Sequence, residues 1–195
     1  MPRPARFDQD SILAAALRVV AAVGPRGVTT EAVAQEMGGH VGSVYYRFPS
    51  NDHLRAQLWM HCARAGHAGI LAALAHPDVG TALEQAVLHY PRWARTEPAR
   101  ARVLAAHGRE ELATHWPIDL TDQLATINDG LIQAVDAFSR RWWGDTDRTH
   151  RQTTTFAVLD MPVAAIRRHL LAGHRPPDAL DAPLLAAARA ALRSS

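Results

Sequence analysis

The sequence contains one cysteine, Cys62, and no lysine. A single thiol cannot form an intramolecular disulfide, and it leaves no cysteine pair for a structural zinc site. No stretch approaches the roughly 20 consecutive apolar residues that a membrane-spanning helix needs. The 12 glycines and 12 prolines follow no period, which excludes a collagen-like chain. We therefore expect a cytoplasmic protein with no disulfide, no metal site and no membrane contact.

Motifs for enzymatic chemistry are also missing. The sequence has no GxSxG elbow, no phosphate-binding P-loop and no dinucleotide-binding fingerprint. Its 11 histidines include no HExxH pattern and no pair four residues apart. We expect no catalytic residue and no cofactor, and therefore no enzymatic activity.

Hydrophobic residues make up 48% of the 195 residues, which is enough for one sizeable core or two small ones. The formal net charge is only +2, and every basic side chain other than histidine is arginine. A charge this small does not support indiscriminate nucleic-acid binding. Arginine forms bidentate bonds to phosphate or guanine, so any contact with DNA must depend on local geometry.

The first 60 residues predict four helices with clear starts and stops. Asp8 can cap a helix over residues 9–23, whose bulky apolar side chains form one stripe; this periodicity favours a packed helix over a secretory signal. Thr29 can cap a second helix over residues 30–37. A glycine pair then permits a tight turn before a third, short helix that Pro49 ends. Ser50 can cap a fourth helix.

Two short helices joined by a glycine turn, after a longer supporting helix, are typical of a helix-turn-helix. Val44 and Phe48 can face the core, which leaves Ser43, Tyr46 and Arg47 on the outside of the third helix. Any small helical bundle could share the helix pattern. The exposed tyrosine and arginine favour DNA binding, because such side chains suit phosphate oxygens and base edges.

The segments Thr29–Ala34, Met37–Gly38 and Gly42–Phe48 resemble the DNA-binding signature of TetR-family transcriptional regulators. Asn51–Leu54 resembles the start of that family's fourth helix. The resemblance implies an all-α fold with an N-terminal helix-turn-helix domain over residues 1–50. It also implies a larger helical domain over residues 51–195 that binds a ligand and forms the dimer.

Carried over by position, the resemblance implies DNA contacts at nine residues: Thr29, His40, Val41, Gly42, Ser43, Tyr45, Tyr46, Arg47 and Asn51. Thr29 and Tyr45 match positions that usually hold DNA phosphates. The sequence departs from the family pattern at three positions. His40 replaces a frequent serine, Gly39 replaces valine, and Asn51 replaces a lysine that would bind phosphate. The loss of that lysine predicts a lower affinity or a weaker salt dependence, although the N-H groups of that helix end can still receive a phosphate.

Glu31 lies on the second helix, near the expected path of a duplex. A carboxylate there repels phosphate unless it accepts a hydrogen bond from a cytosine amino group. We expect a solvent-exposed Glu31 in preference to a base-reading one. For Arg3 and Arg6 two interpretations stay open, an arm in the minor groove and a disordered tail.

Beyond Asn51 the pattern predicts helices over residues 51–75, 78–96, 98–107, 121–143, 146–173 and 178–192, with Pro162 kinking or dividing the fifth. A regulator that responds to a ligand needs a mostly apolar cavity. Candidate lining residues are Tyr90, Trp93, His107, Trp116, Phe138, Trp142, Phe156 and Met161. Each could equally be core, because apolar pockets and apolar cores use the same side chains. The last two helices are the expected homodimer interface, and intramolecular packing of a terminal helix is the alternative.

These observations predict a transcriptional regulator with operator DNA, a small-molecule effector and a second copy of itself as partners. We expect a repressor that the effector releases from DNA. One alternative is a helical small-molecule carrier or enzyme with a vestigial reading head, that is, a helix-turn-helix domain that it does not use. Another is a constitutive DNA-binding protein whose core is filled.

Overall fold

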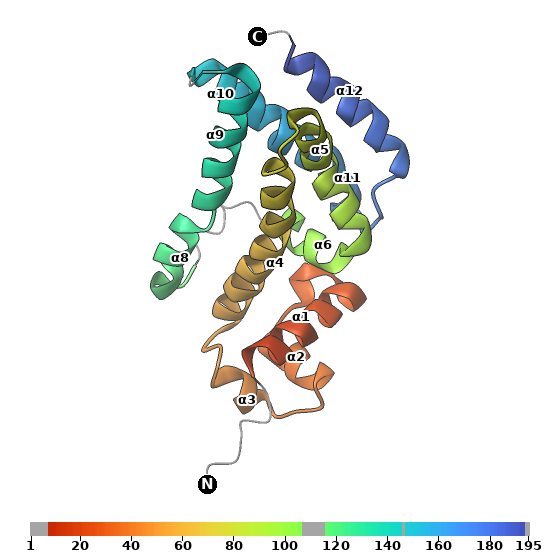
Figure 1. Ribbon diagram of the computed structural model, residues 1–195. Coiled ribbons are helices and arrows are strands. Elements are labelled where there is room, and N and C mark those ends of the chain that lie inside the picture. The colour runs from red at the N-terminus through yellow and green to blue at the C-terminus, as the bar shows by residue number, and fades with distance from the viewer. Residues whose placement is uncertain (1–7, 107–115, 146, 194–195) are drawn as a thin grey trace. The chain divides into compact units, whose positions relative to one another are not determined.

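The computed structural model describes residues 8–106, 116–145 and 147–193 (Figure 1). Every regular element in these ranges is a helix, and no strand occurs in them. The all-α fold class expected from the sequence is therefore confirmed. No helix of these ranges combines the length and the hydropathy that crossing a bilayer requires.

The chain divides into two compact units. Unit 1 comprises the residues up to Ala63 together with Ala99–Ala125, and unit 2 comprises Arg64–Pro98 together with the residues from Thr126 onward. Helix α4, Asn51–Leu74, contributes its first half to unit 1 and its second half to unit 2. This division into units does not test the expected boundary between two domains at residue 50, which stays a prediction.

Unit 1 begins with the helices α1, α2 and α3, and side-chain caps set the starts of α1 and α2. Its remaining elements are short, and the full set is α1 (Gln9–Val23), η1 (Pro25–Gly27), α2 (Thr30–Glu36), α3 (Val41–Tyr45), α6 (Pro98–Ala106), η2 (Ile118–Leu120) and α8 (Thr121–Thr126). The Asp8 carboxylate accepts from the Ser11 backbone N-H at 2.8 Å. The Thr29 hydroxyl accepts from the Ala32 backbone N-H at 3.1 Å. At the start of α4 the Ser50 hydroxyl accepts from the His53 backbone N-H at 3.1 Å, so all three expected caps are present. In each cap a side-chain oxygen satisfies a backbone donor that the first turn leaves unpaired.

The core of unit 1 explains why α1, α2 and α3 pack together. Ile12, Val33, Val44, Phe48 and Leu54 are all buried to within 1% of full burial. These side chains come from α1, α2, α3, the residues that follow α3, and α4. Burying one such side chain stabilises the fold by about 1.5–3 kcal/mol, so this apolar centre fixes the position of the short α3.

Unit 2 is built around α5, which contacts helices on several sides. Its elements are the second half of α4, α5 (Val79–Thr96), α9 (Asp129–Trp143), α10 (Arg148–Thr155), the π-helical turn η3 (Phe156–Asp160), α11 (Met161–Leu171), η4 (Asp178–Leu180) and α12 (Asp181–Ala191). α5 packs against α9, η3, α11 and α12 (Figure 1). Its buried face carries Ala82, Ala86, Val87 and Tyr90, and small alanines at this spacing allow neighbouring helices to approach closely.

Two expected helices differ in detail from the structure. The single helix expected over residues 121–143 is divided: α8 ends at Thr126 and α9 begins at Asp129, with Asn128 at the N-cap. Asparagine and glycine both have low helix propensity, and Asn128 and Gly130 lie at and just after the break, which explains its position.

The helix expected over residues 146–173 is α10, η3 and α11 in succession. Pro162 lies in the first turn of α11, directly after the π-helical turn. Proline lacks an N-H and its ring crowds the preceding turn, so the regular α-helical ladder gives way to the wider turn there. The expected division at Pro162 is present in this form.

Candidate nucleic-acid interface

The connection between α2 and α3 is a tight turn with one left-handed residue. Gly38 has φ +60°, a conformation that side chains with a Cβ rarely adopt. The Gly39 N-H donates to the Ala34 carbonyl oxygen at 3.0 Å, which closes the end of α2. The turn thus delivers the chain directly into α3, as a helix-turn-helix requires.

α3 is anchored by its inner face and open on its outer face. Val44 and Phe48 are each only 1% exposed, whereas Tyr46 is 84% exposed. Ser43 and Arg47 are exposed as well. Burial explains the two apolar residues, and packing within the chain does not explain the exposed tyrosine.

Gly42 lies in the first turn of α3. A Cβ added to it would meet no atom within 4 Å, so intramolecular packing does not require glycine there. Absence of a side chain at this exposed point leaves room for another molecule to approach the α3 backbone closely.

The Tyr45 hydroxyl donates a hydrogen bond to Glu31 Oε1 at 3.0 Å. This bond joins the end of α3 to the first turn of α2. Glu31 is exposed. Exposure in the free protein is compatible with both a carboxylate that stays in solvent and one that reads a base, so that choice stays a prediction. The pKa of its carboxyl is lowered, chiefly by a hydrogen bond to its own backbone N-H and then by the Tyr45 hydroxyl. The carboxylate therefore stays ionised on this surface at neutral pH.

Asn51 joins α2 to α4. Its Oδ1 accepts from the Thr30 backbone N-H at 2.7 Å and from the Thr30 hydroxyl at 3.1 Å. Thr30 is fully buried, so this acceptor satisfies two polar groups that have little access to water. The sequence assigned Asn51 only to a DNA contact, and the structure adds this role within the chain.

The other residues expected to contact DNA lie on or beside the same two helices. Thr29 is half-buried and caps α2. His40 is exposed at the N-cap of α3 and makes no capping hydrogen bond through its side chain, and Val41 is half-buried. The expected minor-groove arm, Arg3 and Arg6, lies outside the described residues. The roles of all nine expected contact residues stay predictions.

The structure places the candidate ligand residues in separate clusters. In unit 2, the Tyr90 ring lies 6.3 Å from Trp93, measured between centroids, and 5.0 Å from His89. Burial raises the pKa of the Tyr90 phenol above its ordinary range. Phe138 lies 5.9 Å from Trp142 by the same measure and is fully buried.

The remaining candidates are more scattered. Trp116 packs edge-on against Trp59 in unit 1, with centroids 5.5 Å apart. Phe156 is 50% exposed and Met161 is half-buried. His107 lies outside the described residues. Nothing in this arrangement decides which of the candidates touch a ligand, so their assignment stays a prediction.

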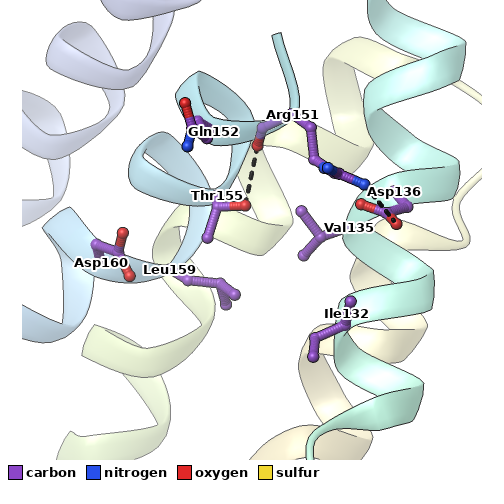
Figure 2. Close-up of a pocket in the computed structure, with 8 residues that line it drawn as sticks. All are labelled: Ile132, Val135, Asp136, Arg151, Gln152, Thr155, Leu159 and Asp160. Atoms are coloured by element: carbon purple, nitrogen blue, oxygen red, sulfur yellow. Dashed lines mark hydrogen bonds and ion pairs between the residues drawn. The ribbon is translucent and has the colours of Figure 1, made fainter. Parts of the chain in front are cut away.

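Unit 2 also has a groove between α9 and the α10–η3 segment, which we call the α9–α10 groove. Figure 2 shows its lining residues, which come from α9 on one side and from the α10–η3 segment on the other: Ile132, Val135, Asp136, Arg151, Gln152, Thr155, Leu159 and Asp160. Its volume is about 450 Å³. Arg151 pairs with Asp136 at 3.7 Å, and burial raises the pKa of Asp160.

A second groove of about 430 Å³ lies between α4 and α5, and we call it the α4–α5 groove. It is lined by Gly69, Ala72, Ala73, Gln85, His89, Arg92, Trp93 and Thr96. Among the candidate ligand residues that the structure describes, Trp93 alone lines one of these two grooves. Sequence reasoning missed the rest because it searched for aromatic residues, and these linings are mostly small, polar or aliphatic.

Comparison with known proteins identifies the family of the helix-turn-helix segment. Residues 12–58 match the family described as bacterial regulatory proteins, tetR family. No curated protein sequence matches the chain.

Several solved structures share the fold across almost the whole chain. PfmR, a TetR family transcriptional regulator from Thermus thermophilus, is 15% identical with a TM-score of 0.69, over 95% of this chain and 98% of its own. The fatty acid degradation regulator FadR from Bacillus halodurans is 15% identical with a TM-score of 0.67, over 96% and 100%. The transcriptional regulator FadR from Bacillus subtilis, solved in complex with stearoyl-CoA, is 14% identical with a TM-score of 0.59, over 95% and 96%. At these identities the likeness establishes the fold alone.

Proposed function

The chain carries a TetR-family DNA-binding domain on the fold of the TetR-family transcriptional regulators, and from this premise we propose that it is a repressor that a small molecule releases from operator DNA. The observation that carries the DNA-binding part is the two-sided character of α3. Buried Val44 and Phe48 hold it rigidly, and Tyr46 and Arg47 project outward. A short helix fixed in this way can enter the major groove without rearrangement.

Binding to DNA depends on few charges. Between Thr29 and Asp52 the sequence has one arginine, Arg47, against the three acidic residues Glu31, Glu36 and Asp52. A helix-turn-helix of this composition gains little binding free energy from neutralising phosphates, so base contacts must supply much of its sequence preference. We expect a modest affinity and a shallow dependence on salt concentration.

Dimer formation through the last two helices is the second part of the proposal. Phe156, Val163 and Leu171 are 50%, 41% and 53% exposed along the η3–α11 segment. Alanines occupy much of the exposed surface of α12. Exposed apolar side chains on one helix and small residues on the next suit a two-fold interface between copies. A dimer would present two α3 helices to half-sites about one helical turn of DNA apart.

Release by an effector is the third part. We assume two conformations, one that binds the operator and one in which the DNA-binding domains are displaced from it. A small molecule that binds better to the second conformation lowers operator affinity by its differential affinity for the two. The two grooves of unit 2 have volumes typical of small-molecule sites. The stearoyl-CoA complex of the Bacillus subtilis regulator supports the idea that this fold accommodates an effector.

The test of the DNA-binding part uses the purified full chain and the DNA upstream of its own gene. We expect a gel shift that survives an excess of random-sequence competitor and maps to a site with approximate two-fold symmetry. A folded protein that shows no sequence preference at modest salt would refute the proposal and favour a carrier.

The test of release uses the same complex with a library of small molecules. A compound that raises the melting temperature of the protein and dissociates the complex supports effector-controlled repression. Operator binding that no stabilising compound releases would instead support a constitutive DNA-binding protein.

A further inference from the structure

We propose that Glu31 reads a base in the major groove by accepting a hydrogen bond from a cytosine amino group, and that Tyr45 positions the Glu31 carboxylate for this contact. The inference rests on the proposed DNA-binding function and identifies a specificity-determining residue within that site. It departs from two expectations based on the sequence: the preference for a solvent-exposed Glu31 over a base-reading one, and the phosphate contact of Tyr45 that the family resemblance implies.

The first step is the proton of the Tyr45 hydroxyl. A phenol has one O-H, and in Tyr45 this group donates to Glu31 Oε1 at 3.0 Å. Phosphate oxygens only accept hydrogen bonds. Tyr45 can therefore donate to a phosphate only if the bond to Glu31 breaks, so the two roles exclude each other.

The second step is what an ionised carboxylate can bind on a duplex. Glu31 is exposed in the first turn of α2, on the side where the end of α3 meets it. Its lowered pKa keeps it ionised, which makes it an acceptor only. A phosphate in contact with it would repel it, whereas the major groove offers amino donors on cytosine and adenine. Glutamate characteristically accepts from the cytosine amino group, and amide side chains are the usual partners of adenine.

The third step is the positioning of the carboxylate. An exposed glutamate side chain rotates freely and loses entropy when it binds. The bond from Tyr45 restricts Glu31 before DNA arrives, and a carboxylate has about four acceptor sites, so it can receive a second donor at the same time. A base contact made by a preorganised acceptor costs less than one made by a mobile side chain.

α2 carries a second acidic residue that serves as a matched control. Glu36 Oε1 accepts from Arg18 Nε at 2.6 Å, so its charge is already paired within unit 1. Glu36→Gln removes the same charge from the same helix as Glu31→Gln. Only Glu31 has the tyrosine partner from α3.

The experiment selects binding sites from a random duplex library with the full-length protein and three variants, Glu31→Gln, Tyr45→Phe and Glu36→Gln. We expect the unmodified protein to select a motif with one fixed cytosine in each half-site. Glu31→Gln loses or changes the preference at that position alone, Tyr45→Phe relaxes it at the same position, and Glu36→Gln keeps the whole motif. In titrations, replacing the fixed C·G pair should weaken the unmodified protein roughly tenfold and the Glu31→Gln variant little.

Two results would overturn the inference while leaving the proposed function intact. If Glu31→Gln selects the same motif at every position, Glu31 reads no base. If Tyr45→Phe weakens all sequences equally with an unchanged motif, its hydroxyl contacts phosphate. If the folded, unmodified protein selects no motif, the proposed function fails and the inference fails with it.

Discussion

Replacing Arg95 should destabilise unit 2 strongly, because its guanidinium ties α5 to the segment before α12. The Arg95 side chain is only 6% exposed. Its Nε donates to the Pro176 carbonyl oxygen at 3.1 Å, and its Nη2 donates to the Pro177 carbonyl oxygen at 3.0 Å. The Asp181 carboxylate accepts hydrogen bonds from both Nη1 and Nη2, and Asp178 Oδ1 lies 3.0 Å from Nε.

The expected loss of unfolding free energy follows from the Asp181 carboxylate, which Arg95→Ala leaves without its main partner. Removing one partner of a buried ion pair typically costs 3–5 kcal/mol of unfolding free energy. Asp181 is 23% exposed and keeps Arg92 at 3.5 Å, so we expect a value near the lower limit, about 3 kcal/mol. For a chain of this size that corresponds to a fall in melting temperature of roughly 6–12 °C. Arg95→Lys should recover only part of the loss, since an ammonium group cannot reproduce the planar fork.

Thermal and urea unfolding of the two variants measure this effect, with Arg189→Ala as the matched control. Arg189 also links α12 to α5, through Glu84 at 3.4 Å, but the two side chains are 50% and 47% exposed. Such a surface pair contributes less than about 1 kcal/mol. If Arg95→Ala lowers stability no more than Arg189→Ala does, the ionic network does not hold α12 in place and the reasoning is wrong.

Three further predictions concern the helix-turn-helix and the loss of stability at low pH. Tyr46→Ala should leave the melting temperature nearly unchanged, because the side chain is 84% exposed, and should weaken DNA binding in a filter-binding titration; a large fall in melting temperature would contradict this. Asn51→Lys should cost about 1–3 kcal/mol in urea unfolding, because it removes the acceptor of two Thr30 donors, while Asn51→Asp keeps that acceptor and should weaken DNA binding by its charge. The pKa of Asp181 is lowered by the hydrogen bond from Arg95, so its contribution to stability should be complete above about pH 4 and disappear as pH falls through its lowered folded value; an unfolding free energy whose pH dependence below pH 4 is the same in Arg95→Ala would refute this.

The helix-turn-helix could be predicted from the sequence because the signals that set it are local. The caps at Asp8 and Thr29 act within three residues, and the left-handed turn at Gly38 needs only a glycine at that position. The alternation of buried Val44 and exposed Tyr46 follows from helical spacing once α3 is placed. Each of these features depends on residues close together in the chain.

Other features could not be predicted because they depend on contacts between distant residues. The bond from Tyr45 to Glu31 spans 14 residues, and the bonds from Thr30 to Asn51 span 21. Spacing does not constrain the direction of such side chains. The family resemblance assigned both Tyr45 and Asn51 to DNA contacts by position, and it gave no information on their partners inside the chain.

Unit 2 shows the same limit for helix breaks and grooves. The break between α8 and α9 was not expected, because the sequence pattern predicts one unbroken helix over residues 121–143. The α9–α10 groove brings Ile132 and Leu159 to opposite walls, and no periodicity along either helix marks them as neighbours (Figure 2). Tertiary packing decides which residues line the groove.

The central claim is that the outer face of α3 lies in the major groove of DNA. Dimethyl sulfate footprinting tests it most directly, because the reagent methylates guanine N7 in the major groove and adenine N3 in the minor groove. On a selected duplex we predict that the full chain protects guanine N7 in two clusters about 10 base pairs apart, and that Arg47→Ala reduces this protection. Binding that leaves every guanine N7 reactive, or that protects only adenine N3, would contradict the account.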